Sequence, residues 1–182
     1  DRMKNSATYF QYHFDREDVE SSLNNLALQH PTGRWKVRML VSITGKVNIE
    51  CTELDELDFP VTGTVRLAAN PVDHRDPHLY HKTTHRAMLN EHLVGNSDVY
   101  DVLLYNREGQ CTEFTRGNLV FELGGEKYTP PIDCGILPGT LRAEMLQNGT
   151  ISERSLEVID IKNCTAFYCI NSVRGVVRVT LE

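Results

Sequence analysis

The sequence lacks the features that place a protein in a membrane or on nucleic acid. No apolar run approaches the roughly 20 residues that a helix needs to cross a bilayer, and the first residues do not resemble a secretory signal peptide. Positive charge is in deficit, because 19 Lys and Arg stand against 25 Asp and Glu, and the net charge is -6. Since nucleic acids and anionic membranes attract basic surfaces, we expect neither as a partner.

The five cysteines and seven histidines form none of the common disulfide or metal-binding patterns. No two cysteines are spaced as CxxC, and an odd number cannot pair completely within one chain. His81 and His85 are spaced as HxxxH, but Glu does not follow His81 and no third ligand lies nearby. We therefore expect no metal, and a reducing, cytoplasmic location.

What the chain does contain is typical of a globular protein of mixed α/β class. Its 182 residues are enough for one large or two small domains, and 40% are hydrophobic and 24% charged. Predicted strands outnumber predicted helices, one of which covers 81–93. Residues 71–77 are polar and rich in chain breakers, so we predict a linker there. It would join a small subdomain at 1–70 to a larger one at 78–182, with a cleft nearby.

One stretch, Tyr80-His81-Lys82-Thr83-Thr84-His85-Arg86, offers an amine among polar and basic neighbours. The ε-amine of a lysine attacks an aldehyde when burial or a neighbouring cation lowers its pKa. If the stretch is helical, Arg86 lies one turn beyond Lys82 and can supply that cation. Taken alone, the pattern is equally typical of a surface lysine on a helix.

Glu113 stands at the end of a predicted strand, in Thr112-Glu113-Phe114-Thr115. In enzymes that use pyridoxal phosphate, an acidic side chain keeps the pyridine nitrogen protonated, so that the ring can accept electrons. The alternative is a carboxylate that faces solvent on an edge strand.

A third segment has the pattern of a phosphate site. Gly139 and Thr140 open a predicted helix, where backbone N–H groups and the helix dipole attract a phosphate dianion. Ser172, after a buried strand, can add a hydroxyl, and Arg2 can add positive charge. Each of these features is ordinary when taken alone.

Together, five motifs in this order resemble the class IV (fold type IV) pyridoxal phosphate enzymes. This family includes branched-chain and D-amino acid aminotransferases and 4-amino-4-deoxychorismate lyase, and the second and fifth motifs look most like the lyase. The motifs are Asp1-Arg2-Met3-x-x-Ser6-Ala7, Lys82-Thr83-Thr84-x-Arg86, Thr112-Glu113-x-x-x-x-Asn118-Leu119, Gly135-Ile136-Leu137-x-Gly139-Thr140-x-Arg142 and Asn171-Ser172-x-Arg174-Gly175.

The resemblance implies a two-subdomain fold and a bound pyridoxal 5'-phosphate. Lys82 would bond to the cofactor aldehyde, and Glu113 would face the pyridine nitrogen. Phosphate would be held by Arg2, Ser172 and the backbone of Thr140 and Leu141. The resemblance also implies a homodimer, a possible association or fusion with aminodeoxychorismate synthase, and an N-terminal strand segment before Arg2 that this sequence lacks.

The reaction that the resemblance favours is elimination of pyruvate from 4-amino-4-deoxychorismate to give 4-aminobenzoate, a step of folate biosynthesis. The first alternative is a class IV aminotransferase for branched-chain or D-amino acids, with Arg116 and Arg174 as candidates to bind the small-molecule substrate. The second is a structural remnant that keeps the fold without catalysis. Fold and cofactor do not choose among these substrates.

Overall fold

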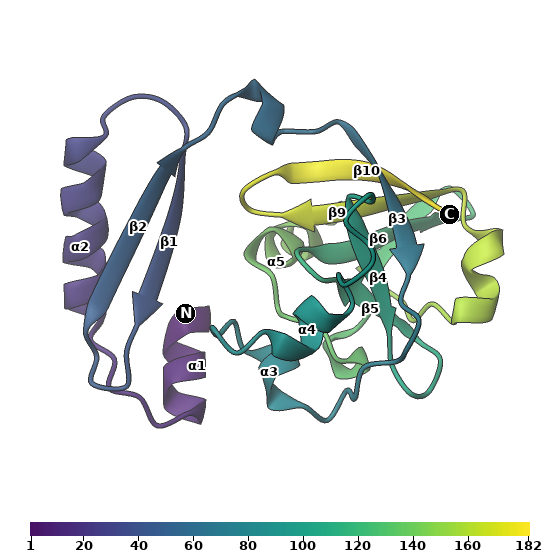
Figure 1. Ribbon diagram of the computed structural model, residues 1–182, viewed down its shortest axis with the longest axis horizontal. Coiled ribbons are helices and arrows are strands. Elements are labelled where there is room, and N and C mark those ends of the chain that lie inside the picture. The colour runs from purple at the N-terminus through teal and green to yellow at the C-terminus, as the bar shows by residue number, and fades with distance from the viewer. The chain divides into compact units, whose positions relative to one another are not determined.

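The computed structural model describes residues 1–182, except the side chain of Leu57. The chain divides into two units, Asp1–Phe59 and Pro60–Glu182. Each unit is described by itself, and the ribbon in Figure 1 labels their helices and strands. In the described part of the chain, no helix is long and apolar enough to cross a membrane.

The first unit consists of two helices and a hairpin. Its elements are α1 (Arg2–Tyr9), α2 (Arg16–Gln29), β1 (Trp35–Val41), β2 (Val47–Glu53) and the 3-10 helix η1 (Glu56–Asp58). Asp15 caps α2, because its side chain accepts hydrogen bonds from the backbone N–H groups of Glu17 and Asp18. The two strands pair antiparallel, as their alternating pattern predicts.

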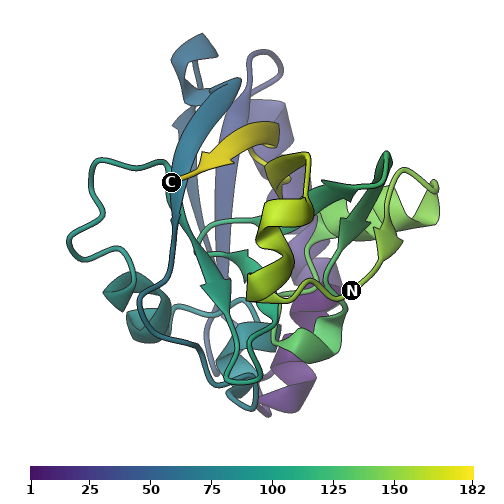
Figure 2. The same ribbon diagram turned by 90° about the vertical axis from the view of Figure 1, so that its right-hand side faces the viewer.

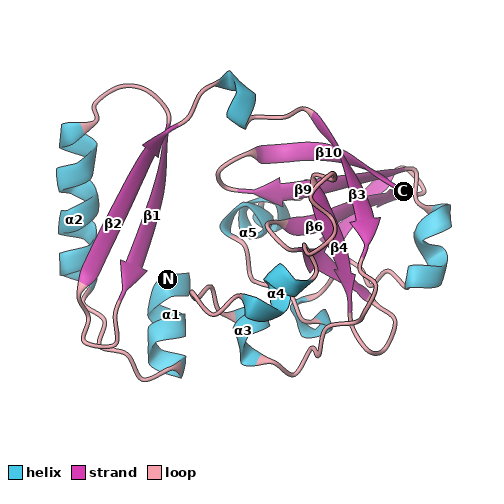
Figure 3. Cartoon of the chain, in the orientation of Figure 1, coloured by secondary structure: helices cyan, strands magenta, loops and turns pink.

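The second unit is built on one large sheet, drawn as magenta arrows in Figure 3. Its strands are β3 (Thr62–Leu67), β4 (Asp101–Tyr105), β5 (Cys111–Phe114), β6 (Asn118–Leu123), β7 (Glu126–Thr129), β8 (Ser152–Glu153), β9 (Ala166–Asn171) and β10 (Gly175–Leu181). They lie in the order β5-β4-β3-β10-β9-β6-β7-β8, and β5 also pairs with β6. This extra pairing, Glu113 opposite Asn118, closes six strands into a ring.

Apolar side chains from strands all round the ring form the main core of the unit, and these include Val65, Leu103, Phe114, Leu119, Phe121 and Val177. Three helices, α3 (Pro77–Tyr80), α4 (Ala87–Glu91) and α5 (Thr140–Gln147), and two 3-10 helices, η2 (Ile132–Cys134) and η3 (Val158–Asn163), occupy the connections. Figure 2 shows η3, in yellow-green, in front of the strands. A smaller core beneath α5 includes Val120, Ile151 and Ile170.

The boundary between the units corrects the predicted one. It lies between Phe59 and Pro60 rather than at 71–77. The physical reason is that β3 pairs in parallel with both β4 and β10, so it belongs to the large sheet. Val72 is buried, and its N–H donates to the carbonyl of Tyr105. The predicted linker is therefore part of the second unit, whereas the mixed α/β class is confirmed.

Candidate active site

Glu113 is a buried carboxyl at the point where the strand ring closes. It lies in β5, and the alternative of a solvent-facing carboxylate is wrong. Its Oε2 accepts a hydrogen bond from Nδ2 of Asn118 at 2.8 Å, and its Oε1 accepts one from the backbone N–H of Leu137 at 3.1 Å. Both oxygens are therefore held in place by the protein.

Burial raises the pKa of Glu113 from its ordinary value of 4.5 to about 8. The hydrogen bond from Leu137 and the positive charges of Lys82 and Arg86 oppose this effect, while the negative charge of Asp101 adds to it. The side chain therefore carries a proton at neutral pH in the cofactor-free protein. A buried acid of this kind can share a proton with a basic ring nitrogen.

Lys82 lies in the loop between α3 and α4, so the helix predicted over 81–93 is confirmed only at Ala87–Glu91 and is wrong at Lys82. Asp76 caps α3, and the chain turns to an extended conformation at His81. The hydroxyl of Thr83 then accepts from the N–H of His85 at 3.1 Å, so a local turn competes with a helix. Lys82 is exposed, and its charge acts on Glu113. The charge of this amine therefore acts on the buried acid, although the two groups lie in different segments of the chain.

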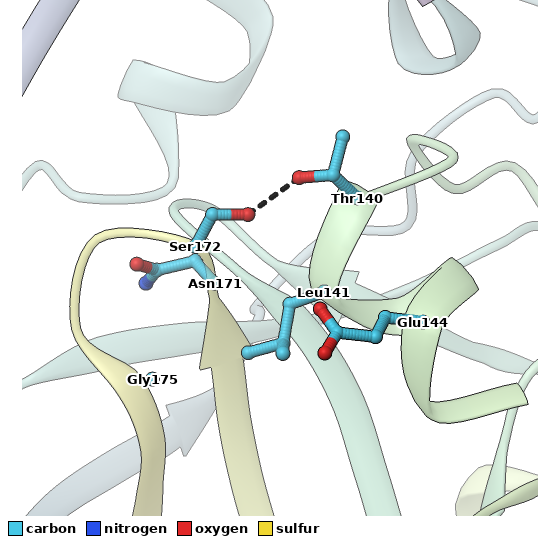
Figure 4. A pocket seen from close by; sticks show the side chains of 6 residues that line it. All are labelled: Thr140, Leu141, Glu144, Asn171, Ser172 and Gly175. Carbon is cyan, nitrogen blue, oxygen red and sulfur yellow. Dashed lines mark hydrogen bonds between the residues drawn. The ribbon is translucent and has the colours of Figure 1, made fainter. Parts of the chain in front are cut away.

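A hollow of about 200 Å³ lies at the start of α5, and its lining residues are Thr140, Leu141, Glu144, Asn171, Ser172 and Gly175 (Figure 4). The hydroxyls of Thr140 and Ser172 point toward each other across it and are 2.5 Å apart. Gly139 precedes the helix in an extended conformation, so the first N–H groups of α5 begin at this hollow. Hydroxyls and helix N–H groups are the donors that a phosphate dianion requires.

These residues fit pyridoxal phosphate at both ends of the molecule. Asn118 connects the two ends, because its Nδ2 donates to Glu113 and also to the carbonyl of Leu137, 2.8 Å away, just before α5. A Cβ added to Gly139 would lie 2.0 Å from Oδ1 of Asn118, so only glycine fits beside that amide. The carboxyl of Glu144 is the acidic group of the hollow, and it opposes a bound anion.

The other predicted site residues lie elsewhere or are engaged by the protein. Arg2 is the first residue of α1, in the first unit, and its contact with phosphate stays a prediction. The Arg116 guanidinium bonds to the carbonyl of Tyr100 and has its Nε 3.5 Å from Oδ2 of Asp101. Arg174 lies in the turn after β9, where the side chain of Asn171 accepts from its backbone N–H.

Sequence reasoning missed two buried charged residues near the site. Asp101 is 1% exposed and accepts hydrogen bonds from the turn between β5 and β6. Arg142 is 4% exposed, and its Nη2 donates to the carbonyl of Pro130 at 2.7 Å and to Glu153 at 2.5 Å, which anchors α5. For Asp101, the sequence signal was a charged residue at the start of an otherwise apolar strand. Among the described side chains, no group of His, Cys, Asp and Glu could hold a metal ion.

The family model described as amino-transferase class IV matches residues 1–181 of this chain. A Schizosaccharomyces pombe protein provisionally named aminodeoxychorismate lyase is 33% identical over 189 aligned positions, which span 99% of this chain and 80% of that protein.

Solved structures give the same fold. A Mesorhizobium loti protein, provisionally described as an amino-acid aminotransferase, superposes with a TM-score of 0.89 at 29% identity, covering all of this chain and 88% of that one. A hypothetical aminotransferase from Mycobacterium tuberculosis in its pyridoxal-phosphate-bound form has a TM-score of 0.81 at 17% identity, covering all of this chain and 74% of that one.

Proposed function

Because the chain belongs to the class IV aminotransferase family, we propose that it uses pyridoxal phosphate to eliminate pyruvate from 4-amino-4-deoxychorismate, leaving 4-aminobenzoate. The main support for a bound cofactor is the buried carboxyl of Glu113. Two N–H donors hold this carboxyl in place, and the charge of Lys82 lowers its pKa against the effect of burial. The choice of the lyase reaction is supported by the relative from Schizosaccharomyces pombe.

The proposed roles follow from the chemistry of each group. When bound, pyridoxal phosphate would supply an aldehyde for the substrate amine and a ring that takes up the electrons of the broken C–H bond and returns them as the C–O bond to the three-carbon group breaks. Glu113 holds a proton at the ring nitrogen, and the hydroxyls of Thr140 and Ser172 hold the phosphate. Nζ of Lys82 acts as the general base for the substrate proton and as the general acid toward the three-carbon group, which leaves as pyruvate.

Of the two arginines predicted to bind substrate, Arg174 is the better candidate. The guanidinium of Arg116 is already engaged by the buried carboxylate of Asp101. Burial raises the pKa of Tyr100, and the positive charges of Arg174 and Arg116 oppose this rise, so the charges of both arginines act on that side chain. We propose that Arg174 contributes positive charge for the substrate carboxylate.

A second candidate function is amino transfer. It is favoured by the Mesorhizobium loti structure, which is 29% identical and superposes over the whole of this chain. In that case the same lysine moves a proton between two carbons, and a keto acid takes the amine. Arg174 would then bind the α-carboxylate of a branched-chain or D-amino acid.

Two assays on one preparation separate these functions. Purified protein loaded with pyridoxal phosphate is given 4-amino-4-deoxychorismate, and pyruvate is measured with lactate dehydrogenase. Amino acids of both configurations are then supplied, and keto acid is measured. The proposal expects pyruvate from wild type and from Lys162→Ala, which changes an exposed lysine on η3, and none from Lys82→Ala. Keto acid without pyruvate would favour the aminotransferase, and neither product would favour a structural remnant.

The assembly and location of the protein are part of the same proposal. We propose a homodimer in the cytoplasm that associates with, or is fused to, aminodeoxychorismate synthase. Light scattering on the purified protein measures its molar mass and so tests the dimer. All five cysteines are free thiols, which suits a reducing compartment. A monomer that carries out the reaction would contradict the dimer.

A further inference from the structure

Asp101, the first residue of β4, directs most of its hydrogen bonds to a single turn. Its Oδ1 accepts from the backbone N–H of Thr115 at 3.1 Å and from the Thr115 hydroxyl at 2.6 Å. Its Oδ2 accepts from the N–H of Arg116 at 3.1 Å, and Oδ1 also accepts from the N–H of Val102 at 2.7 Å. Because Asp101 is 1% exposed, these donors rather than water stabilise its charge.

The turn that Asp101 holds is in direct contact with the loop that carries Lys82. The carbonyl of Thr115 accepts a hydrogen bond of 2.5 Å from Nη2 of Arg86. Arg86 is the last residue of that loop, directly before α4. A bond between residues 29 positions apart therefore ties the loop to the turn. We call Asp101, Thr115 and Arg86 the latch.

The same turn also fixes Glu113, because it joins β5 to β6 just beyond that residue. The N–H of Phe114 donates to the carbonyl of Gly117 at 2.8 Å, which closes the turn. A Cβ on Gly117 would lie 2.7 Å from Sγ of Cys169 and 2.8 Å from the carbonyl of Ile170. The turn is therefore packed tightly against β9 and has no room to shift.

We propose that Asp101 is a positioning residue, which acts through Thr115 and Arg86 to set the place of the Lys82 amine relative to the carboxyl of Glu113. This proposal rests on the proposed function, in which Lys82 and Glu113 bind the same cofactor. Asp101 holds the two chain segments that bear the reacting amine and the buried acid.

The charge of Asp101 matters as well as its geometry. The groups that act on the Glu113 carboxyl include the donors Asn118 Nδ2 and Leu137 N–H, the cations Lys82 and Arg86, and the anion Asp101. Of these five, Asp101 alone brings negative charge. Removing its charge while keeping its shape should therefore make Glu113 easier to ionise.

Four variants test the latch. Asp101→Asn removes the charge and places an amide N–H₂ among donors. Thr115→Val removes the hydroxyl bond and keeps the side-chain shape, whereas Thr115→Ser keeps the hydroxyl. Asp98→Asn is the matched control, because Asp98 is an exposed carboxylate that pairs with Arg66.

Two readouts separate positioning from simple stability. The first is the affinity for pyridoxal phosphate, from titration of the visible band. We expect Asp101→Asn and Thr115→Val to weaken it about fivefold to tenfold, the equivalent of one lost hydrogen bond, with Thr115→Ser and Asp98→Asn close to wild type. The second is the titration midpoint of Glu113 in the cofactor-free protein, from ¹³C carboxyl NMR assigned with Glu113→Gln. We expect Asp101→Asn to lower it, because the negative charge of Asp101 raises the pKa of Glu113.

Each outcome decides one claim. A lower melting temperature of Asp101→Asn with unchanged affinity and midpoint would make Asp101 purely structural and overturn the latch. If Asp101→Asn does not fold, equal affinities of Thr115→Val and Thr115→Ser would overturn it. If wild type gives no visible band, the proposed function fails. The titration midpoint of Glu113 in the cofactor-free protein then still tests whether Asp101 acts on Glu113.

Discussion

Nδ2 of Asn118 donates one hydrogen bond to Oε2 of Glu113 and one to the carbonyl of Leu137, each 2.8 Å long. One amide thus joins the acid at the ring closure to the segment that leads into α5. Because both acceptors are at least partly buried, neither can turn to bulk water when the amide is lost. This pair of bonds ties Glu113, the proposed partner of the ring nitrogen, to the segment before α5, the proposed phosphate site.

Asn118→Ala should therefore weaken both stability and cofactor binding. We expect a loss of about 1–3 kcal/mol in the free energy of unfolding, because two acceptors lose their donor, and about tenfold weaker binding of pyridoxal phosphate. Denaturant unfolding and titration of the visible band measure these. Asn163→Ala, which removes an exposed asparagine bonded to Asp160, is the control. Equal behaviour of the two variants would contradict the role of Asn118.

Gly139→Ala tests the close approach of the backbone to that amide. The added Cβ would lie 2.0 Å from Oδ1 of Asn118, so either the amide or the start of α5 must move. We expect binding of pyridoxal phosphate to fall at least tenfold, as for a lost strong polar contact. The control is Gly124→Ala, where the added Cβ meets open space and costs only backbone strain of about 1 kcal/mol. A Gly139→Ala protein that binds cofactor normally would contradict the geometry.

The raised pKa of Glu113 predicts how stability depends on pH in the cofactor-free protein. The folded state keeps this proton up to about pH 8, whereas an ordinary glutamate releases it near 4.5. The folded state therefore binds more protons in this window, and its stability falls as pH rises from about 4.5 to about 8. Urea unfolding between pH 5 and pH 8 should show this fall in wild type and a flatter profile in Glu113→Gln. Identical profiles would contradict a buried, protonated Glu113.

Thr140→Val distinguishes the phosphate end of the site from the ring end. The variant keeps the side-chain shape and loses the hydroxyl that meets Ser172. We expect binding of pyridoxal phosphate to weaken about fivefold, because one donor to an anion is lost, while binding of pyridoxal, which has no phosphate, is unchanged. Thr180→Val, at an exposed position on β10, serves as the control. An equal loss for both ligands would show that Thr140 does not act on phosphate.

The strands and the caps of this fold follow from short-range patterns. Asp15 has the residue type and position of a helix N-cap, and its side chain caps α2 in the structure. Alternating apolar residues are typical of the two hairpin strands β1 and β2, and an apolar run is typical of the buried strand β4. The Gly139-Thr140 helix start was also predictable, because it depends on residues that are adjacent in the chain.

The arrangement of the site is harder to predict from the sequence, because it depends on contacts between segments that are distant in the chain. A single helix is predicted over 81–93, but the chain is extended at His81 and turns at Thr83, so the helix begins only at Ala87 and Lys82 lies in a loop. No local pattern shows that β3 joins the large sheet, since its partners lie in β4 and β10. The burial of Asp101 is likewise set by a turn 14 positions further along the chain.

The most direct test of the central claim is a visible absorption spectrum of purified protein after pyridoxal phosphate is added and the excess is removed. The measurement is made on wild type, on Lys82→Ala and on the control Lys162→Ala. The account predicts a visible band of lysine-bound cofactor in wild type and in Lys162→Ala, and none in Lys82→Ala. Folded wild-type protein without a band, or a band of equal strength in Lys82→Ala, would contradict it.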